Sequence, residues 1–416
     1  MKFKFLFDAF RDEPYRLFFP LGILLGLVGA NHWSVYAAGW ISQYSGFYHA
    51  ALQMQGTLFC FVIGFLMTAI PRFSASYSAT FPELFYFTAL TLGFAVLMTI
   101  GHWVAAQICY IFSLIGMVRF IALRFLKRRM EVLPPVEFIW IPVGILHGLA
   151  GASISAGVLL EWLPAGWFRV GRLLAEQGFL FSIVAGVGGF LAPRLLGRLE
   201  TISSSEVENP AARARHRKNG MLFYAAGGAL LFSSFLMENA GALRAAYAIR
   251  AIVMTVLFWR NRAWPFLPRN REAYVGCLWA SIGFIIAGSW LVAVFPLYRK
   301  AFLHFVFLGG YSLMSFAVAT MVILSHGGAP HLLKQPLPFL RWTAWGVAAA
   351  LAFRVSAEFF PSRYFPLLAT AATLWSVAAL VWLIALLPRI FSIPKTPEEF
   401  ERCHREAKER VRNLSR

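Results

Sequence analysis

Long apolar runs, each near 20 residues, recur along the whole 416-residue chain. A helix of about 20 apolar residues crosses about 30 Å of hydrocarbon. The runs are continuous and do not alternate with polar residues, which favours helices over strands. We therefore expect an all-α membrane protein of about twelve transmembrane helices. The expected segments are 17–38, 48–70, 82–100, 103–124, 136–159, 172–193, 219–237, 241–259, 273–296, 301–325, 339–359 and 364–388.

The composition supports the same class. Hydrophobic residues make up 59% of the chain and charged residues 14%, against roughly 25% charged in soluble domains. No soluble module interrupts the helices, so we expect a single polytopic domain over 1–416. It would consist of a segment at 1–16, a twelve-helix bundle at 17–388 and a charged tail at 389–416.

The distribution of charge predicts the orientation. Most of the 38 Lys and Arg residues lie at one end of the bundle, in the termini and in alternate connections. Basic connections face the cytoplasm, so both termini are expected there. The net charge of +19 is then a topology signal that also suits anionic lipid, and it requires no nucleic-acid partner.

Four histidines, His32, His49, His102 and His304, lie at the opposite end of the expected helices. Imidazoles gathered at one depth could ligate a metal; the alternative is an interfacial histidine with its polar edge near the headgroups. His49 opens the second helix and His304 the tenth, so the two share a depth. His326 lies one whole helix after His304, and at about 1.5 Å per residue it cannot share a metal with it.

Charged residues also fall within or beside the apolar segments. Arg354 and Glu358 are four residues apart and can form a local pair. Arg250 has no nearby acid in sequence, so its partner must come from another helix or from a bound anion. Arg363 lies in the last connection, at the depth of the two histidines. A structural ion pair or an interface anchor is the alternative for each arginine.

Four blocks of sequence resemble one known family. They are EPYRLFFPLG at 13–22, GFLMTAIP at 64–71, GGFLAP at 188–193, and the stretch 304–328 that begins with a histidine and closes in SHGG. In this order and spacing they resemble the NnrS family. That family consists of twelve-helix proteins of the bacterial inner membrane that bind haem and copper and are linked to nitric oxide and nitrosative stress.

The chain resembles a divergent member of that family. Where the family's second helix opens Trp-His-Ala-His-Glu, this chain reads YHAAL at 48–52, so Ala51 replaces a histidine. Phe190 and Met321 stand where the family has arginines. The resemblance implies haem, whereas the copper that it also implies would lack the histidine ligand missing at position 51.

A second comparison concerns helix order. Haem–copper oxidase core subunits also have twelve helices and hold a low-spin haem by histidines of the second and tenth, the helices that carry His49 and His304. Their copper needs histidines on the sixth and seventh helices, and those helices lack them here. By this fold-level analogy we expect haem b with His49 and His304 as axial ligands and with Arg354 and Arg363 beside its propionates.

Two other functions remain open at this point. A secondary transporter also has twelve helices and a central cytoplasmic connection, although the loop PRFSASY at 71–77 lacks the motif of major-facilitator carriers. A membrane assembly protein without a cofactor is the third hypothesis. The sequence assigns no catalytic residue, redox partner or oligomeric state.

Overall fold

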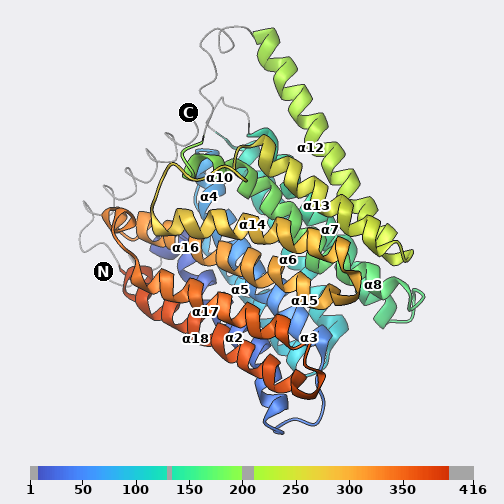
Figure 1. Cartoon of the computed structure of the whole chain (residues 1–416). Helices are drawn as coiled ribbons and strands as arrows, with labels where there is room; N and C mark the ends of the chain where they lie inside the picture. The colour runs from blue at the N-terminus through green and yellow to red at the C-terminus, as the bar shows by residue number, and fades with distance from the viewer. Residues whose placement is uncertain (1–7, 129–133, 199–209, 393–416) are drawn as a thin grey trace.

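The chain folds into a bundle of helices (Figure 1). The computed structural model describes residues 8–128, 134–198 and 210–392, and within these ranges every regular element is a helix. This confirms the all-α prediction. The part of the expected charged tail from 393 onward lies outside the described residues, as does the stretch 199–209 of the long central connection.

All twelve expected segments form helices. The first half contains α2 (Tyr15–Ala37), α3 (Gly46–Ala51) continued by η1 (Leu52–Leu58) and α4 (Phe59–Phe73), α5 (Phe81–Thr99), α6 (Trp103–Leu126), η2 (Val136–Ile139) with α7 (Trp140–Leu159), and α8 (Trp167–Arg172) continued by η3 (Leu173–Gly178), α9 (Phe179–Ile183), η4 (Val184–Gly188) and α10 (Gly189–Leu195). The second half contains α12 (Pro210–Asn239), α13 (Leu243–Arg260), α14 (Ala273–Val294), η5 (Pro296–Tyr298) with α15 (Arg299–His304), η6 (Phe305–Ser312) and α16 (Leu313–His326), η7 (Pro330–Lys334), α17 (Pro338–Ser356), and η8 (Pro361–Arg363) with α18 (Tyr364–Ile390).

Ten of these helical segments, within the described residues, are long and apolar enough to cross a membrane. The chain is therefore a multi-pass membrane protein. The other two expected segments form α13 and α17, which are not among the ten. Each carries arginines, such as Arg250 in α13 and Arg354 in α17, and these lower the mean hydropathy. The count of twelve spans and the cytoplasmic termini stay predictions.

Three spans form the interior of the bundle. Within Gly46–Phe73, Trp167–Leu195 and Pro296–His326, 83%, 78% and 72% of the most apolar window is buried, against 33–50% in the other seven spans. These are the second, sixth and tenth helical segments in chain order, so every fourth segment is an inner one. The outer helices close around them, with α18 packed against both α17 and α2 (Figure 1).

Each inner span is interrupted by a π-helix. The second contains η1, the sixth η3 and η4, and the tenth η6. Such wider turns are rare in proteins, and those that occur are often found at functional sites. Here they accompany close packing: a Cβ on Gly29 of α2 would lie 2.8 Å from the Cβ of Leu52 in η1, and one on Gly310 in η6 would overlap Ile285.

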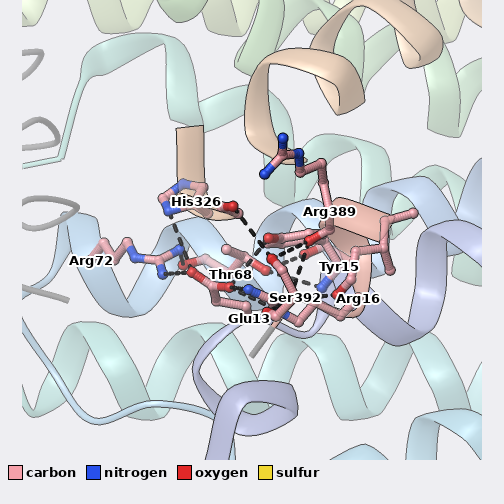
Figure 2. Close-up of polar contacts among 11 residues, drawn as sticks. Glu13, Tyr15, Arg16, Thr68, Arg72, His326, Arg389 and Ser392 are labelled. Atoms are coloured by element: carbon pink, nitrogen blue, oxygen red, sulfur yellow. Dashed lines mark hydrogen bonds and ion pairs between the residues drawn. The ribbon is translucent and has the colours of Figure 1, made fainter. Parts of the chain in front are cut away.

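An ionic cluster joins residues near both ends of the described chain (Figure 2). It includes His326, at the opposite end of the tenth segment from His304. Glu13 accepts from Arg16 (Nη2 at 2.6 Å) and from Arg72 (Nη2 at 3.3 Å), and it faces Nδ1 of His326 at 3.6 Å. Arg16 also donates to the carbonyl oxygen of Ile390, the last residue of α18, at 2.5 Å and to that of Ser392 at 2.9 Å. Two of the four family-like blocks, 13–22 and 304–328, therefore meet around this one carboxylate, and Arg72 directly follows a third.

Replacing Glu13 by alanine is expected to lower the free energy of unfolding by about 3–5 kcal/mol, because it leaves buried arginines without their counter-charge. Thermal or denaturant unfolding of the purified protein in detergent would measure the loss. The matched control is Asp8→Ala. Asp8 and Arg11 form a pair at 3.3 Å in which both side chains are more than a third exposed, so its removal should cost only about 0–1 kcal/mol. Equal stability of the two variants would contradict the structural role of Glu13.

Candidate functional site

A cavity of about 820 Å³ lies at the end of the bundle where the inner spans begin. This volume is within the range of about 300–1,000 Å³ typical of small-molecule and cofactor sites. Three of the four π-helices described above, η1, η3 and η6, contribute to its wall, together with α2, α17 and α18. The deeper wall is apolar and aromatic, and includes Phe61, Phe316 and Trp375.

His49 and His304 line this same cavity from two different inner spans. Nδ1 of His49 lies 2.8 Å from the carbonyl oxygen of Gly29, and Nδ1 of His304 lies 2.7 Å from that of Lys300. A carbonyl oxygen can only accept, so in the neutral ring Nδ1 carries the proton and Nε2 carries the lone pair. A backbone carbonyl on one ring nitrogen is the usual way in which proteins orient a metal-ligating histidine.

The local sequence explains how His49 reaches its carbonyl. Gly29 has no side chain, which lets η1 approach α2 so closely that the next residues of η1 pack on the glycine itself. Gln53, one turn after His49, donates from Nε2 to the carbonyl oxygen of Gly26 at 2.9 Å. The two side chains therefore fix the start of the inner span Gly46–Phe73 against α2.

Arg354 is the third predicted site residue that the structure places in the cavity wall. Its Nε donates to Nε2 of His304 at 3.3 Å, and both terminal nitrogens donate to Oε1 of Glu358 at 3.4–3.5 Å. The predicted local pair of Arg354 and Glu358 is thus confirmed. Arg363, in contrast, is exposed in η8 and is not among the residues that line the cavity.

Four other histidines do not line this cavity. His32 accepts from the backbone N–H of Ser45 at 2.8 Å, and His102 is an exposed residue that precedes α6. His147 lies near both the carbonyl oxygen of Gly178 and Oγ of Ser182, each 3.2 Å from Nδ1. His326 belongs to the Glu13 cluster, so it lies at the opposite end from His304 as the helix length predicts.

No group of three His, Cys, Asp or Glu side chains within residues 8–128, 134–198 and 210–392 is placed to hold a metal ion. An iron held by two histidines within a haem does not need such a group, because the porphyrin supplies its other ligands. The described residues therefore do not supply a metal site of three or more such protein ligands.

Several charged residues of the cavity were not singled out by sequence reasoning. Arg172 and Glu176, on the sixth segment, form an i,i+4 pair with contacts of 2.8 and 3.2 Å and both line the cavity. Their spacing is a recognisable signal for a helix pair. The lining also includes Arg169 and the adjacent pair Arg299 and Lys300, and no spacing in the sequence brings Arg169 to that pair.

A second, smaller cavity of about 100 Å³ adjoins the first and shares Leu58, Phe61 and Ser315 with it. Its lining is almost wholly apolar and comes largely from the three inner spans, including η4 of the sixth. A Cβ placed on Gly188 there would make ordinary van der Waals contact with Phe258 at 3.7 Å. The two cavities are therefore neighbours that share part of their walls.

The family model described as NnrS protein matches residues 9–393. No curated protein sequence matches the chain.

Proposed function

This match covers nearly the whole chain, so the protein belongs to the NnrS family, and on that premise we propose that its cavity binds haem b. His49 and His304 would hold the iron as axial ligands. We further propose that the protein lies in the bacterial inner membrane with both termini in the cytoplasm and takes part in the response to nitric oxide and nitrosative stress.

One observation carries this proposal: two imidazoles from separate inner spans line a single cavity, and a backbone carbonyl at Nδ1 orients each of them. This tautomer places the lone pair of each ring on Nε2. At His304 that nitrogen accepts from Nε of Arg354 at 3.3 Å, a donor that bound iron would displace. The fit extends to charge. Haem is an apolar ring with two carboxylates, and the cavity combines an aromatic interior with cationic side chains, among them Arg354. Arg354, which already donates to the ring of His304, would pair with a propionate.

Two axial histidines favour electron transfer or sensing over chemistry at an open iron position. The roles left to the chain itself are to hold both imidazoles in one tautomer, to exclude water with the aromatic wall and to balance the ligand's charge. The copper implied by the family is not part of the proposal, because Ala51 stands in place of the family's second histidine. A redox partner would have to dock at the end of the bundle where the cavity opens.

The visible absorption spectrum of the full-length protein, purified in detergent after expression with haem supplied, tests the proposal. We expect a Soret band and, by the pyridine haemochrome assay, about one haem b per chain. A colourless protein under these conditions would overturn the haem assignment. It would favour instead the twelve-helix carrier, for which the cationic cavity would be a substrate site, and uptake of organic anions into proteoliposomes would then be measured.

A further inference from the structure

Glu238, at the end of α12, is fully buried and faces three arginines from three other helices. Its carboxylate lies 2.6 Å from Nη1 of Arg250 in α13 and 3.4 Å from Nη2 of Arg169 in α8, and it also contacts Arg299 in α15. The sequence left two sources for the partner of Arg250, another helix or a bound anion, and the structure gives Glu238 of α12 as the partner. Neither Glu238 nor Arg250 lines the cavity, whereas Arg169 and Arg299 both do.

Arg250 is held entirely within the protein. Its Nε donates to Oγ of Ser234 at 2.9 Å and its Nη1 to Oε1 of Gln177 at 3.3 Å. Its guanidinium also lies 4.2 Å from the ring centre of Phe235 and 4.3 Å from that of Tyr247. Arg250 is therefore a fixed internal cation, and its ion pair with Glu238 partly neutralises that carboxylate.

The other two arginines are only partly covered. The side chain of Arg169 is 45% exposed and that of Arg299 is 28% exposed. Each guanidinium has five N–H donors, and the described contacts with Glu238 engage one terminal nitrogen of each. Donors therefore remain on both side chains at the wall of the cavity.

The described residues do not balance the local charge. One carboxylate against three guanidinium groups leaves an excess of two positive charges. Lys300 adds another at the cavity, and the acid that lines the cavity, Glu176, is engaged by Arg172. Clustered cations of this kind repel one another and are stabilised by an anion, which a guanidinium binds through charge-assisted hydrogen bonds.

We propose that Arg169 and Arg299 form an oxyanion-binding subsite at the mouth of the cavity, with Glu238 as the residue that positions them. This subsite is distinct from Arg354, which contacts His304 and Glu358. The oxyanion is a carboxylate of the bound tetrapyrrole or a free inorganic oxyanion. In the first case the inference rests on the proposed function; in the second it stands without it.

The test compares Arg169→Gln and Arg299→Gln with two reference variants. Arg244→Gln is the matched control, because Arg244 is an exposed arginine at the start of α13 that does not line the cavity. Arg299→Lys keeps the positive charge and should retain part of the binding. The probes are metal-free protoporphyrin IX, its neutral dimethyl ester, and sulfate, with the full-length protein in nanodiscs.

We expect each glutamine variant to weaken binding of the porphyrin diacid by about tenfold or more, in line with the loss of a charged hydrogen bond, and to leave the dimethyl ester within about twofold. That result identifies the oxyanion as a ligand carboxylate. If neither porphyrin binds but sulfate raises the melting temperature of the wild type and not of the variants, the oxyanion is inorganic, and the Soret band of the haem-supplied protein decides the haem proposal separately. The subsite is disproved if two results occur together. The variants change the binding of diacid and ester equally, or change neither, and sulfate raises the melting temperature of wild type and variants by the same amount or not at all. This conclusion does not depend on the haem spectrum.

Discussion

Alanine in place of Glu238 is expected to lower the free energy of unfolding by about 3–5 kcal/mol. The substitution leaves the guanidinium of Arg250, which is wholly buried, without the carboxylate at 2.6 Å. A buried charge without a partner pays its desolvation penalty in full. The remaining contacts to Ser234 and Gln177 are to neutral groups and cannot replace a carboxylate.

Thermal unfolding in detergent, followed by circular dichroism, would measure this loss. A double variant would then test whether the unpaired charge of Arg250 causes it. Replacing Glu238 and Arg250 together by leucine removes both charges, and such pairs often exchange for apolar residues at little cost. The double variant should therefore be more stable than Glu238→Leu alone. If the double variant is no more stable than Glu238→Leu, the unpaired charge of Arg250 is not the cause of the lost stability.

Alanine at His49 or at His304 is expected to lower haem occupancy by more than about tenfold. Loss of a residue that only orients a metal ligand costs 10–100-fold in affinity, and loss of the ligand itself should cost at least as much. Each imidazole comes from a different inner span, so neither can substitute for the other. The ratio of Soret to protein absorbance in the purified variants is the measurement.

The control for this comparison is His102→Ala. His102 is exposed before α6 and does not line the cavity, so this variant should keep the haem content of the wild type. Equal haem loss in all three variants would indicate a general loss of fold. Full haem retention in both His49→Ala and His304→Ala would rule out the axial pair.

The sequence predicts the helices well because their signal is local. Continuous apolar length locates each segment, and each expected segment is a helix. The same continuity hides the π-helices: the residues of η6, Phe305–Ser312, are as apolar as their neighbours, and only the hydrogen-bond register distinguishes them. That register depends on packing against Phe284 and Ile285 of α14, which no local pattern reveals.

The sequence predicts only those residues of the candidate site that are identified by their depth along the helices. His49, His304 and Arg354 lie at one level of the helices, and all three line the cavity. Arg363 lies at the same depth, but it falls in the short turn η8 and is exposed outside the cavity. Sequence position gives depth along a helix but not the direction in which a connection presents its side chains.

Contacts between helices were beyond sequence reasoning for a related reason. Glu238 and Arg250 belong to neighbouring helices, α12 and α13, and they meet because these helices pack antiparallel. Arg169 and Arg299 are far apart in the chain and meet only through the same carboxylate. A charged residue within an apolar segment signals that a partner exists, and only the fold identifies it.

We propose that His49 and His304 jointly bind one haem iron. Near-infrared magnetic circular dichroism of the oxidised, purified protein, supported by electron paramagnetic resonance at low temperature, reports the axial ligands directly. A low-spin signature of two imidazoles is expected in the wild type, with loss of that signature in each single alanine variant. A high-spin or single-histidine signature in the wild type, or a two-imidazole signature that survives either substitution, would rule out the axial pair.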